Sequence, residues 1–522
     1  MSTSRTPKTK QVGVGKFSAS IFALATLAGL SACGGGSSNN TQPTQPGQPP
    51  PSAECAIGAP ITTAPSVFAA GASAGSPIPT TYMDMHVGSA NLITSGDVTV
   101  PYGSLRLWDT STGWAQINTG PGTYDWTNLD GFVAAAPAGV DLLYNLARTP
   151  TWASSQPTDS TCSYDTSEQG GPGQCDPPSD LNADGSGTNQ DWINWVTAVA
   201  TRNATQYNNK IKYFEIWNEW NIALFWNPQF ATTAQLVRLE QDARCVVEGP
   251  PSGASCNPNS TFPSGTAINP AAKIVSPSPV GAQTIPNAVQ MNLQNYFGTS
   301  VNGVAGGTFA DAIGFHGYVG TQSSSDPCPN PEEVTTVVGD MASIMPGSPG
   351  AGKPWFDTED GWSKAPDEGF TDPDRQAAFL GRYLLLQASM GVAREYWYRW
   401  DATNDYSGAL WSPTGGVTEA GTADGELYNW ITGNSFLAPG CTPNGGTSVW
   451  SCALSNSSGW KGLAVWDASQ DCDNGTCTYS TFTVPAGGYT QYLDLAGNTT
   501  SVGGPTVQIG TKPILLENGT LP

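Results

Sequence analysis

The sequence is poor in charge, and above all in positive charge. Only 12% of its 522 residues are charged, and 20 Lys and Arg stand against 42 Asp and Glu, which gives a formal net charge of -22 at pH 7. A protein that binds nucleic acid or lies on anionic lipid needs a basic surface, so both classes are excluded. A strongly polyanionic substrate is disfavoured for the same reason.

Histidine and metal-ligand spacings are also scarce. The chain has only two histidines, His86 and His316, and no Cys-x-x-Cys pair among its 11 cysteines. Zinc sites in proteins usually combine several Cys and His ligands. We therefore expect no metal site, and nothing in the sequence indicates a cofactor.

Apolar runs long enough to cross a membrane, about 20 residues, are lacking as well. The run from Phe17 to Leu30 follows a basic segment without acids and is typical of a secretory signal peptide. It ends in Leu-Ser-Ala-Cys at Cys33, which resembles the lipobox of bacterial lipoproteins. The resemblance implies that Cys33 is lipid-modified and begins the mature protein; an ordinary signal peptide with a chance cysteine is the alternative.

These features predict an exported protein, anchored by lipid at the outer membrane or surface of a bacterial cell. Residues 1–32 would be the lipoprotein signal peptide. Residues 33–52 are rich in Gly, Ser, Asn, Thr, Gln and Pro and would form a flexible tether. We expect the protein to be a monomer whose membrane contact is the lipid alone.

The cysteines support export. Once Cys33 is assigned to lipid, ten remain, and disulfides are expected in an oxidising compartment. Eight of them form pairs that are local in sequence: Cys162 with Cys175, Cys245 with Cys256, Cys441 with Cys452, and Cys472 with Cys477. Cys55 and Cys328 are left and could pair by elimination.

Most of the chain alternates short β-prone runs with longer stretches of helical or loop character. Residues 191–206 and 374–390, for example, place apolar side chains at helical spacing. The β-prone runs number eight: Tyr82–Val87, Ser104–Trp108, Asp141–Leu146, Ile211–Trp217, Lys273–Ser276, Ala312–His316, Trp355–Thr358 and Arg394–Trp400. Eight such units predict an α/β fold, a (β/α)8 TIM barrel over residues 53–435. A doubly wound open sheet is the alternative, but no Gly-rich phosphate loop follows the first run.

The last part of the chain has a different pattern. After about Phe436, short alternating strands are separated by Gly and Asn turns, which predicts a small β-sandwich domain over residues 436–522. The expected strands are Lys461–Trp466, Thr478–Val484, Thr490–Leu495, Pro505–Ile509 and Lys512–Leu516.

Two glutamates lie at the ends of predicted barrel strands, where barrel enzymes carry their chemistry. Glu219 follows Asn218 after the fourth strand, and Glu359 follows the seventh, each beside aromatic residues. Two facing carboxylates are the minimum needed to cleave a glycosidic bond. The 18 Trp of this weakly charged chain suit a sugar ligand, which offers apolar faces and hydroxyls together.

Six motifs occur in barrel order and together resemble the clan of retaining (β/α)8 glycoside hydrolases that contains family 5 cellulases and family 39 xylosidases. The resemblance is closest to family 39 and covers about Tyr82 to Gly433. The motifs are Ser104–Trp108 with its Arg106, Leu146–Ser154, Asn218-Glu219, His316-Gly317-Tyr318, Glu359, and Tyr396–Trp400. The resemblance implies a retaining O-glycosyl hydrolase, a β-glycosidase acting on a largely uncharged polysaccharide or oligosaccharide.

The resemblance also implies roles for individual residues. Glu219 would be the general acid/base, and Glu359 the nucleophile, kept ionised by Arg106. Asn218 would bind the substrate 2-hydroxyl, and His316 would orient Tyr318 or the acid/base. The expected substrate-binding residues are Arg106, Asn218, His316, Tyr318, Trp397 and Trp400, with the choice between the two tryptophans left open by the strand register.

Two positions depart from the clan pattern. Trp220 stands where relatives usually have Pro, and Asp360 stands where they usually have an aromatic residue, which would put a negative charge beside the nucleophile. These departures leave the sugar, the linkage and endo or exo action open. A catalytically silent barrel that binds glycan as a surface lipoprotein is the alternative function, although both glutamates are present.

Overall fold

The structure is a computed structural model that describes residues 59–63, 75–162, 171–263, 267–281, 287–319, 328–362, 370–401 and 408–521. Residues 50–522 form one compact unit. The predicted signal peptide, the tether, Cys33 and Cys55 lie outside the described residues.

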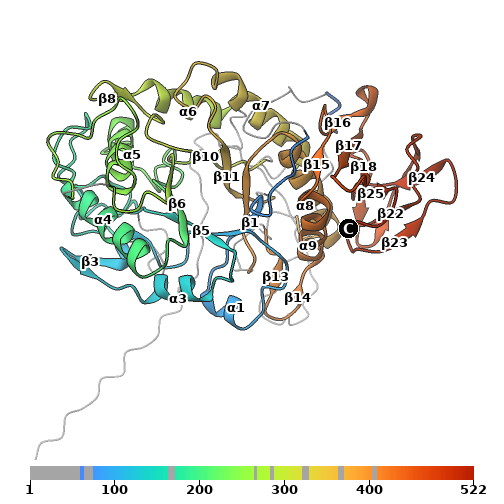
Figure 1. The fold of residues 1–522 in the computed structure, drawn as a ribbon, viewed down its shortest axis with the longest axis horizontal. Coiled ribbons are helices and arrows are strands. Elements are labelled where there is room, and N and C mark those ends of the chain that lie inside the picture. The colour runs from blue at the N-terminus through green and yellow to red at the C-terminus, as the bar shows by residue number, and fades with distance from the viewer. Residues whose placement is uncertain are drawn as a thin grey trace, which may run out of the picture. The chain divides into compact units, whose positions relative to one another are not determined.

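The core of the fold is a barrel of eight parallel strands (Figure 1). The last strand pairs with the first, and a bridge between Val275 and Ala312 joins the two remaining edges. All eight predicted strands are confirmed, and each lies within or close to its predicted range. The strands are β1 (Met83–Met85), β2 (Ser104–Leu107), β5 (Asp141–Asn145), β6 (Ile211–Glu215), β7 (Lys273–Val275), β10 (Ile313–Phe315), β11 (Trp355–Asp360) and β12 (Arg394–Trp397).

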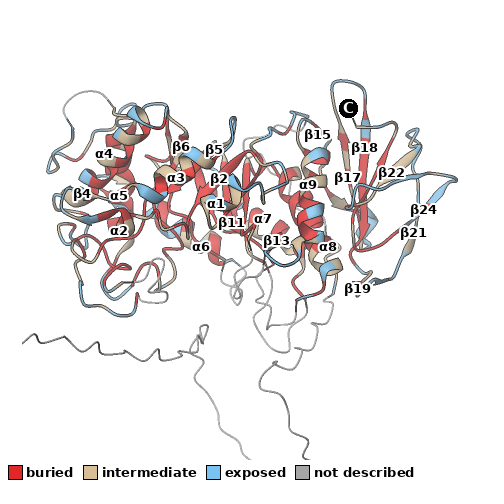
Figure 2. Ribbon diagram, turned by 90° about the horizontal axis from the view of Figure 1, so that it is seen from below, coloured by how far each residue is buried: buried red, intermediate tan, exposed pale blue. Residues whose placement is uncertain are grey.

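Helical segments follow each barrel strand and cover the outside of the sheet, so that the strands are buried on both faces (Figure 2). Their starts follow capping rules: Thr232 and Gln235 form a capping box before α5, and Asp372 caps α8, whose first residue is Pro373. The helices are α1 (Ala90–Thr94), α2 (Trp114–Ile117), α3 (Thr127–Ala135), α4 (Gln190–Thr205), α5 (Thr233–Val247), α6 (Ala288–Gly298), α7 (Val334–Ile344), α8 (Pro373–Ser389) and α9 (Glu419–Ile431).

Three two-stranded hairpins decorate the loops of the barrel. Within the described residues they are β3 (Asn118–Gly120) with β4 (Thr123–Tyr124), β8 (Ser300–Val301) with β9 (Val304–Ala305), and β13 (Trp411–Ser412) with β14 (Gly416–Val417).

The C-terminal domain is an antiparallel β-sandwich, as the sequence predicted. One sheet contains β15 (Ser435–Phe436), β16 (Thr442–Pro443), β17 (Val449–Ser455), β18 (Lys461–Asp467), β25 (Ile514–Glu517), β22 (Gln491–Leu493) and β23 (Thr499–Ser501). The others pair β21 (Ser480–Thr483) with β24 (Thr506–Ile509), and β19 (Cys472–Asp473) with β20 (Thr476–Cys477). The sequence analysis missed β17, a long strand that buries alternate residues.

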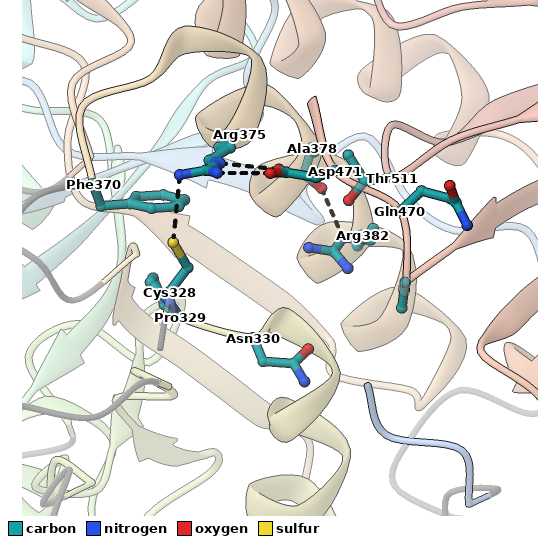
Figure 3. Close-up of a pocket in the computed structure, with 11 residues that line it drawn as sticks. Cys328, Pro329, Asn330, Phe370, Arg375, Ala378, Arg382, Gln470, Asp471 and Thr511 are labelled. Atoms are coloured by element: carbon teal, nitrogen blue, oxygen red, sulfur yellow. Dashed lines mark hydrogen bonds and ion pairs between the residues drawn. The ribbon is translucent and has the colours of Figure 1, made fainter. Parts of the chain in front are cut away.

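Barrel and sandwich share a continuous buried core. The Trp466 indole N–H donates to Glu332 at 2.8 Å, and the Arg375 guanidinium donates to Asp471 at 3.0 and 2.7 Å. A cavity of about 40 Å³ lies at this junction, away from the strand ends, and Figure 3 shows its polar lining. The residues that line it are Cys328, Pro329, Asn330, Phe370, Arg375, Ala378, Arg382, Ala468, Gln470, Asp471 and Thr511.

The four local disulfides are confirmed: Cys162–Cys175, Cys245–Cys256, Cys441–Cys452 and Cys472–Cys477. The fifth predicted pair involves Cys55, which is outside the described residues. Among the residues that the structure describes, no helix combines the length and apolar character that a membrane span requires.

A group of buried carboxyl groups lies between the sheet and α8. Asp357 on β11 is paired with Glu395 on β12, and a bulge in β11 brings Asp360 beside them. Asp357 accepts hydrogen bonds from Tyr383 and Gln387 of α8, and the side chain of Asp360 is hydrogen-bonded with those of Asp357 and Glu395. Burial, reinforced by the neighbouring carboxylates, raises the pKa values of Asp360 and Glu395 well above the ordinary range.

We expect the stabilisation from these protons to be lost as the pH rises. The folded chain keeps them at pH values where the unfolded chain, with pKa values near 4, has released them. The free energy of unfolding therefore falls as pH rises from about 4 toward the raised pKa values, by up to about 1.4 kcal/mol per pH unit for each group. Glu395→Gln removes one of these titrations, so urea unfolding between pH 5 and 8 should show a shallower decline.

The control variant is Asp184→Asn. Asp184 is exposed, and hydrogen bonds from Ser186 lower its pKa, so it is ionised in both states over this range. The stability of Asp184→Asn should follow that of the wild type at every pH. The same parallel behaviour in Glu395→Gln would contradict the raised pKa assigned to Glu395.

Candidate active site

Glu219 and Glu359 face each other at the C-terminal end of the barrel. Glu219 follows β6 by four residues, and Glu359 lies near the end of β11. Both side chains are mostly buried, and one carboxyl oxygen of each lies within 4.8 Å of the other and of a ring nitrogen of His316. The structure thus brings together the two carboxylates that the sequence analysis selected.

Arg106 connects both sides of this pair. Its guanidinium is fully buried and donates from Nη1 to Glu359 at 2.8 Å, from Nε to Glu215 at 2.7 Å, and from Nη2 to the side-chain oxygen of Asn218 at 2.7 Å. Three directed bonds use the fork of the guanidinium, which a lysine could not reproduce. Arg106 is therefore part of the framework beneath the mouth as well as a partner of Glu359.

Glu215 forms the floor of the site. It also accepts hydrogen bonds from Asn145 at 2.8 Å, Ser278 at 2.5 Å and Thr358 at 2.7 Å. With Arg106, its carboxylate is bonded from four strands or strand ends of the barrel, so its oxygens are satisfied by the protein. This arrangement gives Glu215 a structural role, in contrast with Glu219 and Glu359.

His316 contacts the predicted acid/base. Its Nδ1 lies 2.8 Å from Glu219 Oε1, and its Nε2 has no partner within the described part of the chain. Burial and the charge of Arg106 lower the pKa of His316, so the ring is neutral at pH 7. Of the two roles expected for this histidine, the geometry supports orientation of Glu219, because Tyr318 donates to Glu359 at 3.1 Å instead.

The two glutamates have different electrostatic surroundings. Burial raises the pKa of Glu219 well above its ordinary value, and the charge of Glu359 raises it further. Burial also raises the pKa of Glu359, but the ion pair with Arg106 and the hydrogen bond from Tyr318 oppose this rise. Glu359 is therefore the first to ionise, and Glu219 retains the proton.

Trp397 is the last residue of β12, and Trp400 lies in the loop that follows. The strand register gives the two tryptophans different surroundings. Side chains alternate along a strand, and Trp397 points away from the barrel interior, against Phe379 and Tyr383 of α8 at ring distances of 6.4 and 6.3 Å. Its indole N–H donates to the Gly408 carbonyl at 2.7 Å, and its side chain is fully buried. These contacts favour a packing role for Trp397 over the substrate-binding role that was predicted for it.

Trp400 is also fully buried, but its indole N–H has no acceptor among the described residues. The nitrogen of the Asn218 side chain is in the same condition. A buried donor without a partner is costly. Together with Nε2 of His316, these two groups are consequently the candidates, within the predicted set, to hydrogen-bond a bound ligand.

The sequence analysis expected Asp360 to place a negative charge beside the predicted nucleophile, Glu359. The structure contradicts this expectation. The bulge in β11 turns the side chain of Asp360 toward Asp357 and Glu395 on the α8 side of the sheet, where burial keeps it protonated. The sequence analysis also missed Tyr398, whose hydroxyl donates to Asp109 at 2.5 Å. The alternation from Tyr396, which faces the barrel interior, would have placed Tyr398 there.

Possible metal ligands occur in two settings. The groups that include cysteine, Asp159 with Cys162–Cys175 and Asp374 with Cys472–Cys477, contain disulfide sulfurs, which do not offer a thiolate. In the mouth, Glu219, His316 and Glu359 are close enough to share an ion, but each already has a protein partner. Their contacts suit proton transfer, because Glu219 has a raised pKa beside the neutral His316, and Glu359 is its ionised partner.

The fold is similar to those of solved glycoside hydrolases. A family 39 glycoside hydrolase from the gut symbiont Bacteroides cellulosilyticus WH2 matches with a TM-score of 0.57 and 15% identity, over 84% of this chain and 81% of that chain. A monomeric β-xylosidase from Caulobacter crescentus CB15 matches with a TM-score of 0.53 and 16% identity, over 85% and 97%. The likeness concerns the fold of this chain.

A family 30 endoxylanase from Clostridium papyrosolvens C71 shows the same likeness, with a TM-score of 0.51 and 14% identity over 85% of this chain and 97% of that chain. No protein-family model and no curated protein sequence matches the chain. The comparisons thus establish a (β/α)8 barrel with a C-terminal β-sandwich, and the residues in the mouth carry the argument about activity.

Removing Arg106 should strongly destabilise the fold. Arg106→Met leaves Glu215 buried and charged without its cation, which costs roughly 3–5 kcal/mol of unfolding free energy. Lys512→Met is the control, because Lys512 pairs with Asp374 and Glu419 where all three are partly exposed, and its loss should cost about 1 kcal/mol or less. Urea unfolding measures both values, and equally small losses would contradict the central role given to Arg106.

Proposed function

We propose that the protein is a retaining glycoside hydrolase, a β-glycosidase that cleaves O-glycosidic bonds of a largely uncharged polysaccharide or oligosaccharide. The observation that carries this proposal is the pair Glu219 and Glu359, with carboxyl oxygens within 4.8 Å of each other. One carboxyl group contacts a neutral histidine, and the other is ion-paired with Arg106. This is the difference in protonation that a glycosidase requires.

The short separation supports retention of configuration. Retaining glycosidases hold their carboxyl groups about 5–5.5 Å apart, whereas inverting enzymes leave about 6.5–9.5 Å for a water molecule. One carboxyl oxygen of Glu219 lies within 4.8 Å of one of Glu359, which suits the shorter separation. Glu359 is thus proposed to attack the anomeric carbon directly.

The reaction takes two displacements. In the first, ionised Glu359 bonds to the anomeric carbon while Glu219 gives its proton to the departing oxygen. In the second, Glu219 takes a proton from water, the water oxygen bonds to the anomeric carbon, and Glu359 leaves. The free N–H of the Asn218 side chain suits a hydrogen bond to the 2-hydroxyl, which strengthens as positive charge develops on the ring.

The cellular location and the charge of the protein complete the proposal. The signal peptide would direct export and be removed, and the lipidated Cys33 and the tether would hold the enzyme at the bacterial outer membrane or cell surface, as a monomer without a cofactor. The formal net charge of -22 and the carboxylates in the mouth favour an uncharged glycan over an acidic one.

A non-catalytic glycan-binding lipoprotein on the same barrel is the second candidate. The contacts of Glu219 and Glu359 argue against it. Glycan binding alone does not require one protonated and one ionised carboxyl group with oxygens within 4.8 Å of each other. Substitution of these residues decides between the two.

Glu359→Gln should abolish hydrolysis of an activated aryl glycoside, because the amide cannot form the glycosyl-enzyme. The thermal midpoint should stay nearly unchanged, because Arg106 keeps its bond to Glu215. Glu219→Gln should slow hydrolysis of substrates with poor leaving groups by roughly 10²–10⁴-fold, the usual value of a general acid. Steady-state kinetics and thermal unfolding measure these effects.

The matched control is Glu419→Gln at the exposed start of α9, which should leave the rate unchanged and, through its exposed contact with Lys512, lower the midpoint only slightly. Loss of folding in Glu359→Gln would point to a structural role. Hydrolysis of a panel of polysaccharides, with product sizing and determination of the anomeric configuration, identifies the sugar. An inverted product would refute the assignment of Glu359 as nucleophile.

A further inference from the structure

A third carboxyl group lies at the mouth of the barrel. Asp109 comes two residues after the end of β2, the strand that carries Arg106. The C-terminal ends of barrel strands are the positions that contact substrate. Asp109 is partly exposed there, while its neighbours Trp108 and Thr110 are buried.

The backbone at Asp109 is held in an unfavourable conformation. Its φ is 55°, in the left-handed region, which Asp and Asn tolerate better than other residues with a Cβ. Such strain costs on the order of 1–3 kcal/mol and persists where the surrounding structure imposes it, commonly at functional sites. Here the strained turn directs the carboxyl group toward the last strand of the barrel.

Tyr398 holds the carboxyl group in place. Its hydroxyl donates to Asp109 Oδ2 at 2.5 Å, and its ring packs edge-on against His86 at 4.8 Å. The Nε2 of His86 lies 3.0 Å from the carbonyl oxygen of Thr358, the residue before Glu359. A chain of contacts therefore connects Asp109 with the nucleophile side of the mouth.

The charge of Asp109 is also felt by both catalytic glutamates, and it raises the pKa values of Glu219 and Glu359. Asp109 also follows the strand whose Arg106 donates to Glu359 at 2.8 Å, so it lies at the edge of the mouth in which the reacting sugar ring must fit. Burial raises the pKa of Asp109, while the hydrogen bond from Tyr398 and the charge of Arg399, which is ion-paired with Asp401 at 2.9 Å, oppose this rise.

We infer that Asp109 is a substrate-binding residue whose carboxylate accepts a hydrogen bond from a ring hydroxyl, other than the 2-hydroxyl, of the neutral sugar that reacts with Glu359. The inference rests on the proposed function and deepens it, because it makes the recognised ring one that carries a free hydroxyl on the Asp109 side. The bond would be charge-assisted and would fix the ring between Glu219 and Glu359.

The test pairs Asp109→Asn with monodeoxy substrates. Asparagine keeps the size of the side chain and an acceptor for Tyr398 but removes the charge. On the aryl glycoside that the panel identifies, kcat/KM should fall by roughly 10- to 100-fold, the value of a hydrogen bond to a charged group. The 3-deoxy and 4-deoxy analogues, and the 6-deoxy analogue if the sugar is a hexose, are then compared in both enzymes.

For one analogue, kcat/KM of the wild type should fall by a factor similar to that caused by Asp109→Asn. The same analogue should lower kcat/KM of Asp109→Asn little further, because both changes remove the same bond. Asp401→Asn is the control at the same mouth, and its effect should multiply with that of every deoxy substitution. Multiplicative losses in Asp109→Asn for all analogues would overturn the inference. If Asp109→Asn does not fold, Tyr398→Phe should weaken discrimination of one ring hydroxyl, and equal discrimination of all would overturn it.

The failures are distinguishable. A wild type that hydrolyses no glycoside refutes the proposed function and this inference with it. A wild type that is active, with no coupling between Asp109 and any ring hydroxyl, refutes only the inference.

Discussion

The interior of this barrel depends on one buried cation. Arg106 is surrounded by Glu215, Glu359 and Asn218, and each of its bonds reaches a different part of the site. A buried guanidinium is tolerated only where its charge is matched and its donors are used. The ion pair with Glu215 fixes the arginine from below, which leaves the pair with Glu359 to set the charge of that carboxyl group. Folding energy and the electrostatics of the mouth thus depend on the same side chain.

Acidic residues outnumber basic ones in this chain, and this affects the buried carboxyl groups elsewhere in the barrel. On the outer face of the sheet, Asp360 and Glu395 lack such a cation and are neutralised by protons instead. The mouth combines both solutions, because Glu359 has Arg106 and Glu219 keeps a proton beside a neutral histidine. A low content of lysine and arginine therefore turns burial, more than ion pairing, into the main control of carboxyl ionisation.

The barrel strands could be predicted because each is a short apolar run between helical stretches, a signal that is local in the chain. The missed strand β17 has Ser and Cys among its residues and shows its alternation only when its burial is known. The pairing of Glu219 with Glu359 followed from motif order. The choice between Trp397 and Trp400 stayed open and Tyr398 was missed, because a motif of consecutive aromatics does not reveal which residues point inward.

The sequence by itself determined the order of elements, the four local disulfides and the identities of the two facing glutamates, since all of these follow from neighbouring residues or from position along a repeating βα pattern. Only the tertiary structure decided which carboxyl groups are protonated, which tryptophan is packing, and that Asp109 borders the site. Those properties depend on contacts such as Tyr398 with Asp109, between residues 289 positions apart. Burial and distance between remote strands set them, and neither is written in the local pattern of the chain.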